Sequence, residues 1–477
     1  MAKAGRPRRE ESRGELTGEE IAAFEAGFGG EVIRPDDPGY DEARRIWNGM
    51  IDKRPALIAR CRGPADVAAA VNFARERDLP VAIRGGGHNV AGTALCDDGI
   101  VVDLSEMDGV RVDPEARTVR AEGGATLGDV DRETQAFGLA TPLGVVSETG
   151  IAGLTLNGGI GHLRRKYGLS CDNLASVDVV TADGEIRTAS AEREADLFWA
   201  LRGGGGNFGV VTSFEYDLHE VGPEVYGLFV VHHGDVAIEA IERFREYAAS
   251  ASRSASVLPF YGFVPELEEF PEDAWGEPMV VFLGCYDGET DDAVSEFRDL
   301  RTLAEPIVDF SGPMPYTELQ SMLDEDYPDG NYYYWKATYL TDLDDDVIEY
   351  VVRRGEESPS ALSTVDLWHL GGAIGDVAPD ATAFWHREKP YMLTFEANWD
   401  DPDDSDANVE WVRESIAGVR EMPVAAGGYG NFPGFHEDPA LELFGGNYDR
   451  LVEVKTEYDP GNLFRLNQNV PPRAGEP

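Results

Sequence analysis

The sequence predicts an α+β protein with two domains, and three observations support this prediction. The chain has 477 residues, of which 42% are hydrophobic, so it can bury more than one core. Up to about Gly222, short apolar runs alternate with amphipathic helical stretches. Beyond that point, long alternating apolar runs are interleaved with helical stretches, which is typical of an antiparallel sheet covered by helices on one face.

The first domain is expected to follow a polar N-terminal tail, residues 1–40, that contains one short helix near residues 18–26. Periodicity predicts helices at 64–77 and 126–137, the second opened by Thr126 as its N-cap. The expected strands are 56–59, 80–83, 99–104, 118–121, 176–181, 185–189 and 209–216. Asp183-Gly184, between two of these strands, predicts a hairpin turn.

The second domain is expected to contain an antiparallel sheet and a layer of helices. Its expected strands are 225–231, 279–283, 332–340 and 391–399. Its expected helices are 236–249, 291–303, 347–356 and 408–420. A last segment, rich in Asn, Gly and Pro, runs to residue 472.

The charge of the chain is strongly negative. It has 89 acidic and 41 basic residues, a formal net charge of −48, and only six lysines. Because it also has 8 Trp, 18 Tyr and 21 Phe, it does not read as a disordered acidic protein. We expect a folded protein with an acidic surface, as in salt-loving organisms, that loosens in low salt. This charge disfavours nucleic acid and anionic membranes as partners.

The four cysteines, Cys61, Cys96, Cys171 and Cys285, are far apart and form no CxxC pair. This spacing disfavours a structural zinc site and a disulfide framework, so we expect no metal. No apolar run approaches the ~20 residues of a membrane span, and no apolar segment follows the arginine-rich N-terminus. We therefore expect a cytoplasmic protein.

The stretch Arg84-Gly85-Gly86-Gly87-His88-Asn89 directly follows an apolar run. Its glycines allow a sharp turn with bare N–H groups, and successive N–H groups can form a nest for phosphate. A second cluster contains Gly150, Gly153, Gly158, Gly159 and Gly161. Together the clusters indicate a bound dinucleotide, for which we favour a flavin, with His88 beside it. Taken alone, the glycines could be ordinary turns and His88 could satisfy a loop carbonyl. No GxGxxG motif opens a helix, which disfavours a nicotinamide Rossmann site.

These clusters belong to a series of ordered blocks that carry a family resemblance. The blocks are Val81-x-x-Arg84-Gly-Gly-Gly-His88-Asn-x-x-Gly92, Asp103-Leu-Ser, Gly123-Gly124-Ala-Thr-Leu, Gly150-x-x-Gly153-x-x-x-x-Gly158-Gly159-x-Gly161, Arg165-Lys-Tyr-Gly168-x-x-x-Asp172 and Arg202-Gly-Gly-Gly-Gly-Asn207-Phe-Gly209. A closing segment runs from Tyr429-x-Asn431-Phe432 to Asn467-Gln468. Over roughly residues 45–472 the chain resembles the berberine bridge enzyme-like oxidoreductases of the vanillyl-alcohol oxidase superfamily, which have a PCMH-type FAD-binding fold.

The resemblance implies an FAD-binding domain at 41–220, a substrate-binding domain at 221–425, and a segment at 426–477 that completes the FAD domain. It also implies a covalent bond from His88 to the C8α methyl of the isoalloxazine ring. Several members add a second, cysteinyl link, but Val146 occupies that position here, so we expect a single link. The residues expected to contact FAD are His88, Arg84, Gly85, Gly86, Gly87, Asn89, Gly92, Val146, Gly150, Gly153, Gly158, Gly159, Asn207, Val211, Tyr429 and Asn431.

The resemblance makes Tyr429 the candidate catalytic base. Its ordinary pKa is about 10, so this role requires a nearby cation or a proton relay. Met392 and Thr394 occupy the positions of the family's polar partner, and Glu396, on the same face of the strand, is the candidate that replaces it. The candidate substrate contacts are the alternating residues Tyr332, Tyr334 and Lys336, together with Trp368, all of which could equally be core residues.

We therefore expect an FAD-dependent oxidoreductase that oxidises a CH–OH group of a sugar or alcohol, or a CH–NH group, by hydride transfer to a covalent flavin that oxygen reoxidises. Two alternatives stay open. One is an aldose or alcohol dehydrogenase that uses an electron acceptor other than oxygen. The other, suggested by Met392 and Thr394, is a catalytically inactive flavin-binding protein. A homo-oligomer is also left open.

Overall fold

The computed structural model describes residues 16–473 apart from residues 436 and 438. Residues 1–15 of the expected tail and 474–477 of the expected closing segment therefore lie outside the described residues. Helix α1 (Gly18–Glu25) begins where the sequence predicts a short helix, because Thr17 and Glu20 form a capping box. No helix in the described part of the chain combines the length and the apolar composition needed to cross a bilayer.

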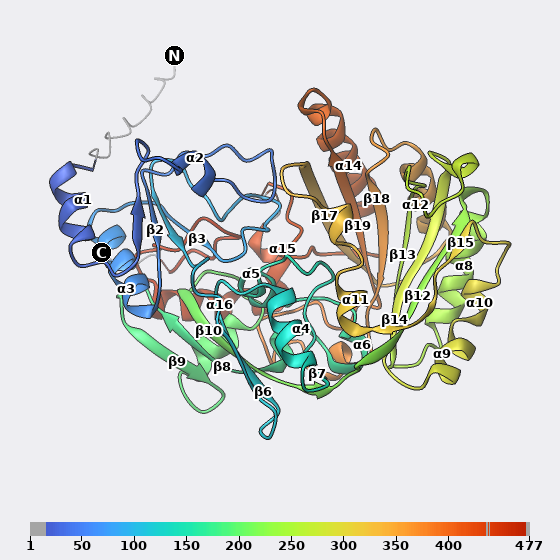
Figure 1. Cartoon of the computed structure of the whole chain (residues 1–477), viewed down its shortest axis with the longest axis horizontal. Helices are drawn as coiled ribbons and strands as arrows, with labels where there is room; N and C mark the ends of the chain where they lie inside the picture. Colours follow the sequence, from blue (N-terminus) through green and yellow to red (C-terminus); the bar gives the residue numbers. More distant parts are fainter. Residues whose placement is uncertain (1–15, 436, 438, 474–477) are drawn as a thin grey trace, which may run out of the picture.

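The first part of the chain forms two larger sheets (Figure 1) and a short two-stranded one, from β7 (Leu139–Ala140) and β11 (His219–Glu220). The four-stranded sheet has the order β1-β2-β4-β3, from β1 (Glu31–Ile33), β2 (Leu57–Arg60), β3 (Val81–Arg84) and β4 (Ile100–Asp103). Two of its pairings, β2 with β4 and β4 with β3, are parallel, and α3 (Pro64–Glu76) connects β2 to β3. The carboxyl ends of these three strands therefore lie at one edge of the sheet, and the Gly85–Gly87 turn begins there, at the end of β3.

The second sheet is antiparallel, with the order β5-β6-β10-β8-β9. Its strands are β5 (Val110–Asp113), β6 (Thr118–Glu122), β8 (Leu174–Val180), β9 (Ile186–Ser190) and β10 (Val210–Asp217). β8 and β9 form the expected hairpin, with Gly184 at φ +82° in its turn. Helices α4 (Leu127–Gln135), α5 (Ile151–Leu156), α6 (Arg164–Tyr167) and α7 (Ala195–Leu201) complete this part, and Thr126 caps α4 as predicted.

A third sheet has nine strands, all paired antiparallel, in the order β15-β12-β14-β13-β18-β19-β17-β20, with β16 beside β12. The strands are β12 (Glu224–His233), β13 (Ala255–Phe263), β14 (Pro278–Tyr286), β15 (Val308–Asp309), β16 (Gly312–Pro315), β17 (Tyr332–Leu340), β18 (Thr364–His369), β19 (Tyr391–Trp399) and β20 (Ala425–Ala426). Helices α8 (Ala237–Ala248), α12 (Asp345–Glu356) and α14 (Ser405–Arg420) pack on one face (Figure 1). The expected helix at 291–303 is instead two short helices, α9 (Thr290–Glu296) and α10 (Arg298–Arg301), broken at Phe297.

Side chains alternate between the two faces of this sheet. Leu228, Leu367 and Phe395 join the core under the helices. On the same strands, Phe229, Trp368 and Met392 point to the opposite face, toward the first part of the chain. Because both faces are covered, the strands are hydrophobic on both sides.

The last segment returns to the first part of the chain. Helix α16 (Tyr448–Tyr458) packs against α7, and the buried Lys455 donates to the Asn207 carbonyl at 2.7 Å and to the Asp459 carboxylate at 2.7 Å. The Asn207 side chain in turn binds the backbone of Gln468 and Val470 at 3.2 and 3.0 Å. The predicted two-domain α+β class is confirmed, while the domain boundaries given from sequence stay a prediction.

Candidate active site

A cavity of about 810 Å³ lies where the first part of the chain meets the open face of the third sheet. Its walls come from three regions: the glycine turns after β3 and before α5, the face of the third sheet that carries no helices, and the closing segment. Residues far apart in the sequence, such as His88, Glu396 and Tyr429, therefore line one space.

The glycine turns pack against each other through bare backbone. A Cβ atom added to Gly86 would lie 2.5 Å from the Gly150 nitrogen, and one added to Gly150 would lie 2.4 Å from the Gly86 nitrogen. Gly87 has φ +73°, a conformation that residues with side chains rarely adopt. Only glycine allows this approach, and the paired turns form a concave backbone surface suited to phosphate.

His88 lies in the wall of the cavity and is half-buried. Its ring stacks on the Trp47 ring at a centroid distance of 4.1 Å, and Trp47 stacks in turn on Tyr333 at 3.8 Å. Among the described residues, no group hydrogen-bonds to its Nε2 atom. Burial lowers the pKa of His88 to about 4, so the ring is neutral near pH 7 and keeps a nitrogen lone pair. The stacked ring is thus held in place with one nitrogen available for a bond.

Tyr429 presents its hydroxyl oxygen to several hydrogen-bond donors. Asn431 Nδ2 donates to it at 2.9 Å, and the backbone N–H groups of Gly159 and Ile160 also face it. Burial raises the pKa of Tyr429 above its ordinary value, and these donors oppose that rise by stabilising the phenolate. In the described part of the chain no Lys or Arg lines the cavity, so these donors are the groups that favour the deprotonated form of Tyr429, and the expected cation or proton relay stays a prediction.

Glu396 lies on the open face of β19, as alternation predicts. Thr394 Oγ1 donates to its Oε1 at 3.1 Å, and the Tyr327 hydroxyl donates to its Oε2 at 3.1 Å. The carboxyl of Asp366, on the neighbouring strand β18, interacts with it, and burial raises the pKa of both carboxyls. Asp366 was not predicted, because β18 has no clear alternation and a lone aspartate gives no other signal.

Many of the residues expected to contact the cofactor line this cavity. They are Gly85, Gly86, Gly87, His88, Asn89, Val146, Gly150, Gly153, Val211, Tyr429 and Asn431. Arg84, Gly92, Gly158, Gly159 and Asn207 do not line it. Arg84 instead donates to the Ala43 carbonyl at 2.7 Å, Gly92 abuts Ile51, and Gly158 lies beneath the Phe384 ring. Their contacts are with the surrounding fold.

The expected substrate contacts on β17 lie on the wrong face of the sheet. β17 pairs with β19 so that Trp335 lies opposite Glu396, which puts Trp335 on the cavity side. Tyr332, Tyr334 and Lys336 therefore point away from the cavity, and Tyr334 and Lys336 hydrogen-bond to Glu437. Alternation could not decide the face, because residues 332–335 are all aromatic. Trp368, the fourth expected contact, does line the cavity.

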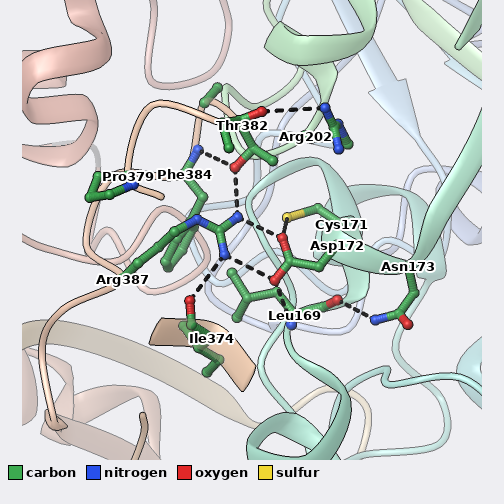
Figure 2. Close-up of polar contacts among 12 residues, drawn as sticks. Leu169, Cys171, Asp172, Asn173, Arg202, Ile374, Pro379, Thr382, Phe384 and Arg387 are labelled. Carbon is green, nitrogen blue, oxygen red and sulfur yellow. Dashed lines mark hydrogen bonds and ion pairs between the residues drawn. The ribbon is translucent and has the colours of Figure 1, made fainter. Parts of the chain in front are cut away.

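A buried ion pair joins the two parts of the chain beside the cavity (Figure 2). Arg387, from the loop before β19, donates to the Asp172 oxygens at 2.6 and 2.9 Å and to Thr382 Oγ1 at 2.6 Å. The same loop places the Phe384 ring against Gly158 and near Tyr429. Arg387 thus fixes the position of the loop that packs behind Tyr429.

Comparisons with known proteins agree with this arrangement. A model of an FAD-binding domain matches residues 55–190, and a model described as berberine and berberine-like matches residues 428–471. An FAD-linked oxidoreductase of Dictyostelium discoideum is 33% identical over 93% of this chain and 95% of its own length. The (R)-6-hydroxynicotine oxidase of Paenarthrobacter nicotinovorans is 32% identical over 93% of this chain and 97% of its own.

Solved structures show the same fold. That of 6-hydroxy-D-nicotine oxidase from Arthrobacter nicotinovorans has a TM-score of 0.82 at 30% identity, covering 93% of this chain and 98% of that one. A xylooligosaccharide oxidase from Myceliophthora thermophila, in complex with xylobiose, also has a TM-score of 0.82, at 23% identity, covering 96% of this chain and 100% of that one. The second likeness concerns the fold alone.

Proposed function

The chain belongs to the berberine bridge enzyme-like FAD-linked oxidoreductases, and from this membership we propose that it oxidises a CH–OH or CH–NH group of a small molecule and passes the electrons to oxygen. One observation carries the proposal: His88 with its glycine turns, Tyr429 and Glu396 all line a single cavity. The cavity therefore has both a surface for the cofactor and groups that can take a proton from a substrate.

The residues present fit FAD. The paired turns at Gly86 and Gly150 leave backbone N–H groups open to a pyrophosphate, and His88 has a ring nitrogen with no partner among the described residues. When bound, FAD supplies the acceptor for two electrons and a hydride. We propose that His88 carries the single covalent link. None of the four cysteines lines the cavity, and the position of the family's second link is Val146.

The proposed proton acceptor is Tyr429. Asn431 Nδ2 donates a hydrogen bond to its oxygen at 2.9 Å, and the backbone N–H groups of Gly159 and Ile160 also favour its deprotonated form. Glu396 is the second candidate, and Thr394 orients it with a hydrogen bond at 3.1 Å. Thr394 therefore orients Glu396. Its presence at the position of the family's polar partner is thus weaker support for a catalytically inactive flavin-binding protein.

Acid denaturation tests the cofactor assignment. We expect the purified protein to be yellow and to keep its flavin when denatured in acid, and His88→Ala to release it. His232→Ala is the matched control, because His232 is buried but lies on β12, where it bonds the Leu300 carbonyl at 2.9 Å. A flavin released from the unaltered protein would contradict the covalent link, and a colourless protein would contradict the function.

Anaerobic mixing tests the reaction. A substrate should bleach the flavin, and Tyr429→Phe should slow bleaching by about 10² to 10⁴ without loss of flavin. Admission of oxygen should then restore the colour quickly. Slow recovery that an artificial electron acceptor accelerates would favour a dehydrogenase, and bleaching by Tyr429→Phe at the original rate would remove Tyr429 from the mechanism.

A further inference from the structure

Apart from His88 and two tyrosines, every ionisable side chain that lines the cavity in the described part of the chain is a carboxyl group. Glu269, Glu318, Glu325 and Asp326 are exposed at its rim, and Asp366 and Glu396 lie inside it. Oppositely charged lining residues would cancel this field, but none is present among those described. Low-dielectric walls lined by one sign of charge concentrate ions of the other sign. The cavity therefore has the electrostatics of a site for cations.

The two inner acids lie side by side on the open face of the sheet. In the register of β18 and β19, Asp366 lies opposite Thr394 and Glu396 lies opposite Thr364, so the two carboxyls are diagonal neighbours. Their carboxyl groups interact with each other. Two adjacent carboxylates repel, so the two groups do not ionise together and can share one proton. Once a cation is beside it, the pair can therefore hold one proton and one negative charge.

The general acidity of the chain does not account for this pair. Acids that keep a protein soluble lie on its surface, whereas Asp366 and Glu396 are 4% and 2% exposed. The described structure offers Asp366 Oδ1 no hydrogen-bond partner. A buried charge without a partner is costly, so a positive group from outside the chain would stabilise the ionised form of the pair.

Aromatic rings line the same cavity as the pair. Trp335 lies 5.3 Å from both Tyr327 and Phe432, measured between ring centroids, and Phe432 lies 5.3 Å from Tyr429 and 6.4 Å from Trp368. All five rings line the cavity. Aromatic faces attract ammonium groups and also pack on an apolar body.

We propose that Asp366 and Glu396 form a one-charge carboxyl pair that selects a protonated amine with an apolar or aromatic body over a neutral alcohol or sugar. This inference rests on the proposed function, because it names the substrate class of the same cavity. The ammonium proton passes to the ionised carboxyl of the pair, which leaves a neutral amine and a fully protonated pair. Asp366 is thus a specificity-determining residue, and Glu396 shares that role.

Binding of three probes tests the inference: N,N-dimethylbenzylamine as its cation, benzyl alcohol as a neutral molecule of similar shape, and xylobiose. Quenching of Trp335 and Trp368 fluorescence and perturbation of the flavin spectrum both report occupancy of the cavity. We expect the unaltered holoprotein to bind the amine at least about 30-fold more tightly than either neutral probe. Equal or tighter binding of benzyl alcohol or xylobiose would overturn the inference.

Variants identify the residues responsible. Asp366→Asn should weaken amine binding by about 30-fold or more and leave benzyl alcohol binding unchanged, and Glu396→Gln should act in the same way. Glu268→Gln is the matched control, because it also removes one negative charge but is exposed and does not line the cavity. Unchanged amine binding in both inner variants would overturn the inference, as would an equal loss in Glu268→Gln. Because tryptophan fluorescence needs no flavin, these results remain distinct from a failure of the FAD assignment.

Discussion

Replacement of Arg387 by methionine should destabilise the whole protein, because it leaves the Asp172 carboxylate buried without its partner. The Arg387 side chain is 0% exposed and that of Asp172 is 8% exposed, so water cannot take over the lost contacts. Breaking a buried ion pair by removing one partner costs about 3–5 kcal/mol. Globular proteins unfold with an entropy of about 2.1 cal/mol/K per residue, which gives ~1 kcal/mol/K for this chain if it unfolds as one unit. Dividing the lost free energy by this entropy predicts that Tm should fall by about 3–5 °C.

The assay is thermal unfolding followed by circular dichroism at constant salt, for Arg387→Met, Asp172→Asn and the double variant. The double variant should be more stable than Arg387→Met, because it leaves no unpaired buried charge. The interaction free energy between the two positions should then be at least about 2 kcal/mol. Additive effects within about 0.5 kcal/mol would refute the reasoning. Arg387→Lys should recover only part of the loss, because an ammonium group cannot bind both Asp172 oxygens in the planar arrangement of a guanidinium.

Three further predictions concern the cofactor cradle, pH and salt. Gly86→Ala should abolish flavin loading, because its Cβ would lie 2.5 Å from the Gly150 nitrogen, whereas Gly312→Ala, which has open space around it, should load normally. The measurement is flavin absorbance per protein. A fully loaded Gly86→Ala would contradict the assignment of the glycine turns as the phosphate site. Burial lowers the pKa of His162 from 6.5 to about 3, so below pH 6.5 the unfolded chain takes up a proton that the folded chain does not, and stability falls as pH falls toward 3. His162→Phe should therefore reduce the loss of unfolding free energy between pH 7 and 5 by about 2 kcal/mol, as measured with urea, and an unchanged loss would mean that other groups cause it. With a net charge of −48, the protein should unfold at lower temperature in low KCl than in molar KCl, and equal Tm values would contradict the inference of a salt-adapted protein.

Alternation of side chains predicted part of the site and failed where its signal was absent. On β19 it correctly put Met392, Glu396 and Asn398 on one face, and that face lines the cavity. On β17 both faces of the strand are aromatic, so only the pairing of Trp335 with Glu396 shows which side is open. That pairing is a contact between distant parts of the chain, which local periodicity does not specify.

The strands β13 and β18 were not predicted from the sequence, and for this reason part of the candidate site was not predicted either. β13 contains Pro259, which argues against a central strand, and β18 has six residues without a clear alternation. Asp366 lies on β18, so the partner of Glu396 could not be found before the strand was placed. The glycine motifs were easier to interpret, since backbone contact at Gly86 and Gly150 requires glycine itself.

The closing segment packs back on the first part of the chain, and this contact determines when the cavity can form during synthesis. Tyr429, Asn467 and Gln468 line the cavity, and Lys455 and Val470 bind Asn207 across more than 240 residues of intervening chain. During synthesis, the glycine turns and His88 leave the ribosome long before these last contacts exist. The cavity proposed for the flavin is therefore closed only after the entire third sheet has been made, and the proposed attachment to His88 would follow the synthesis of the closing segment.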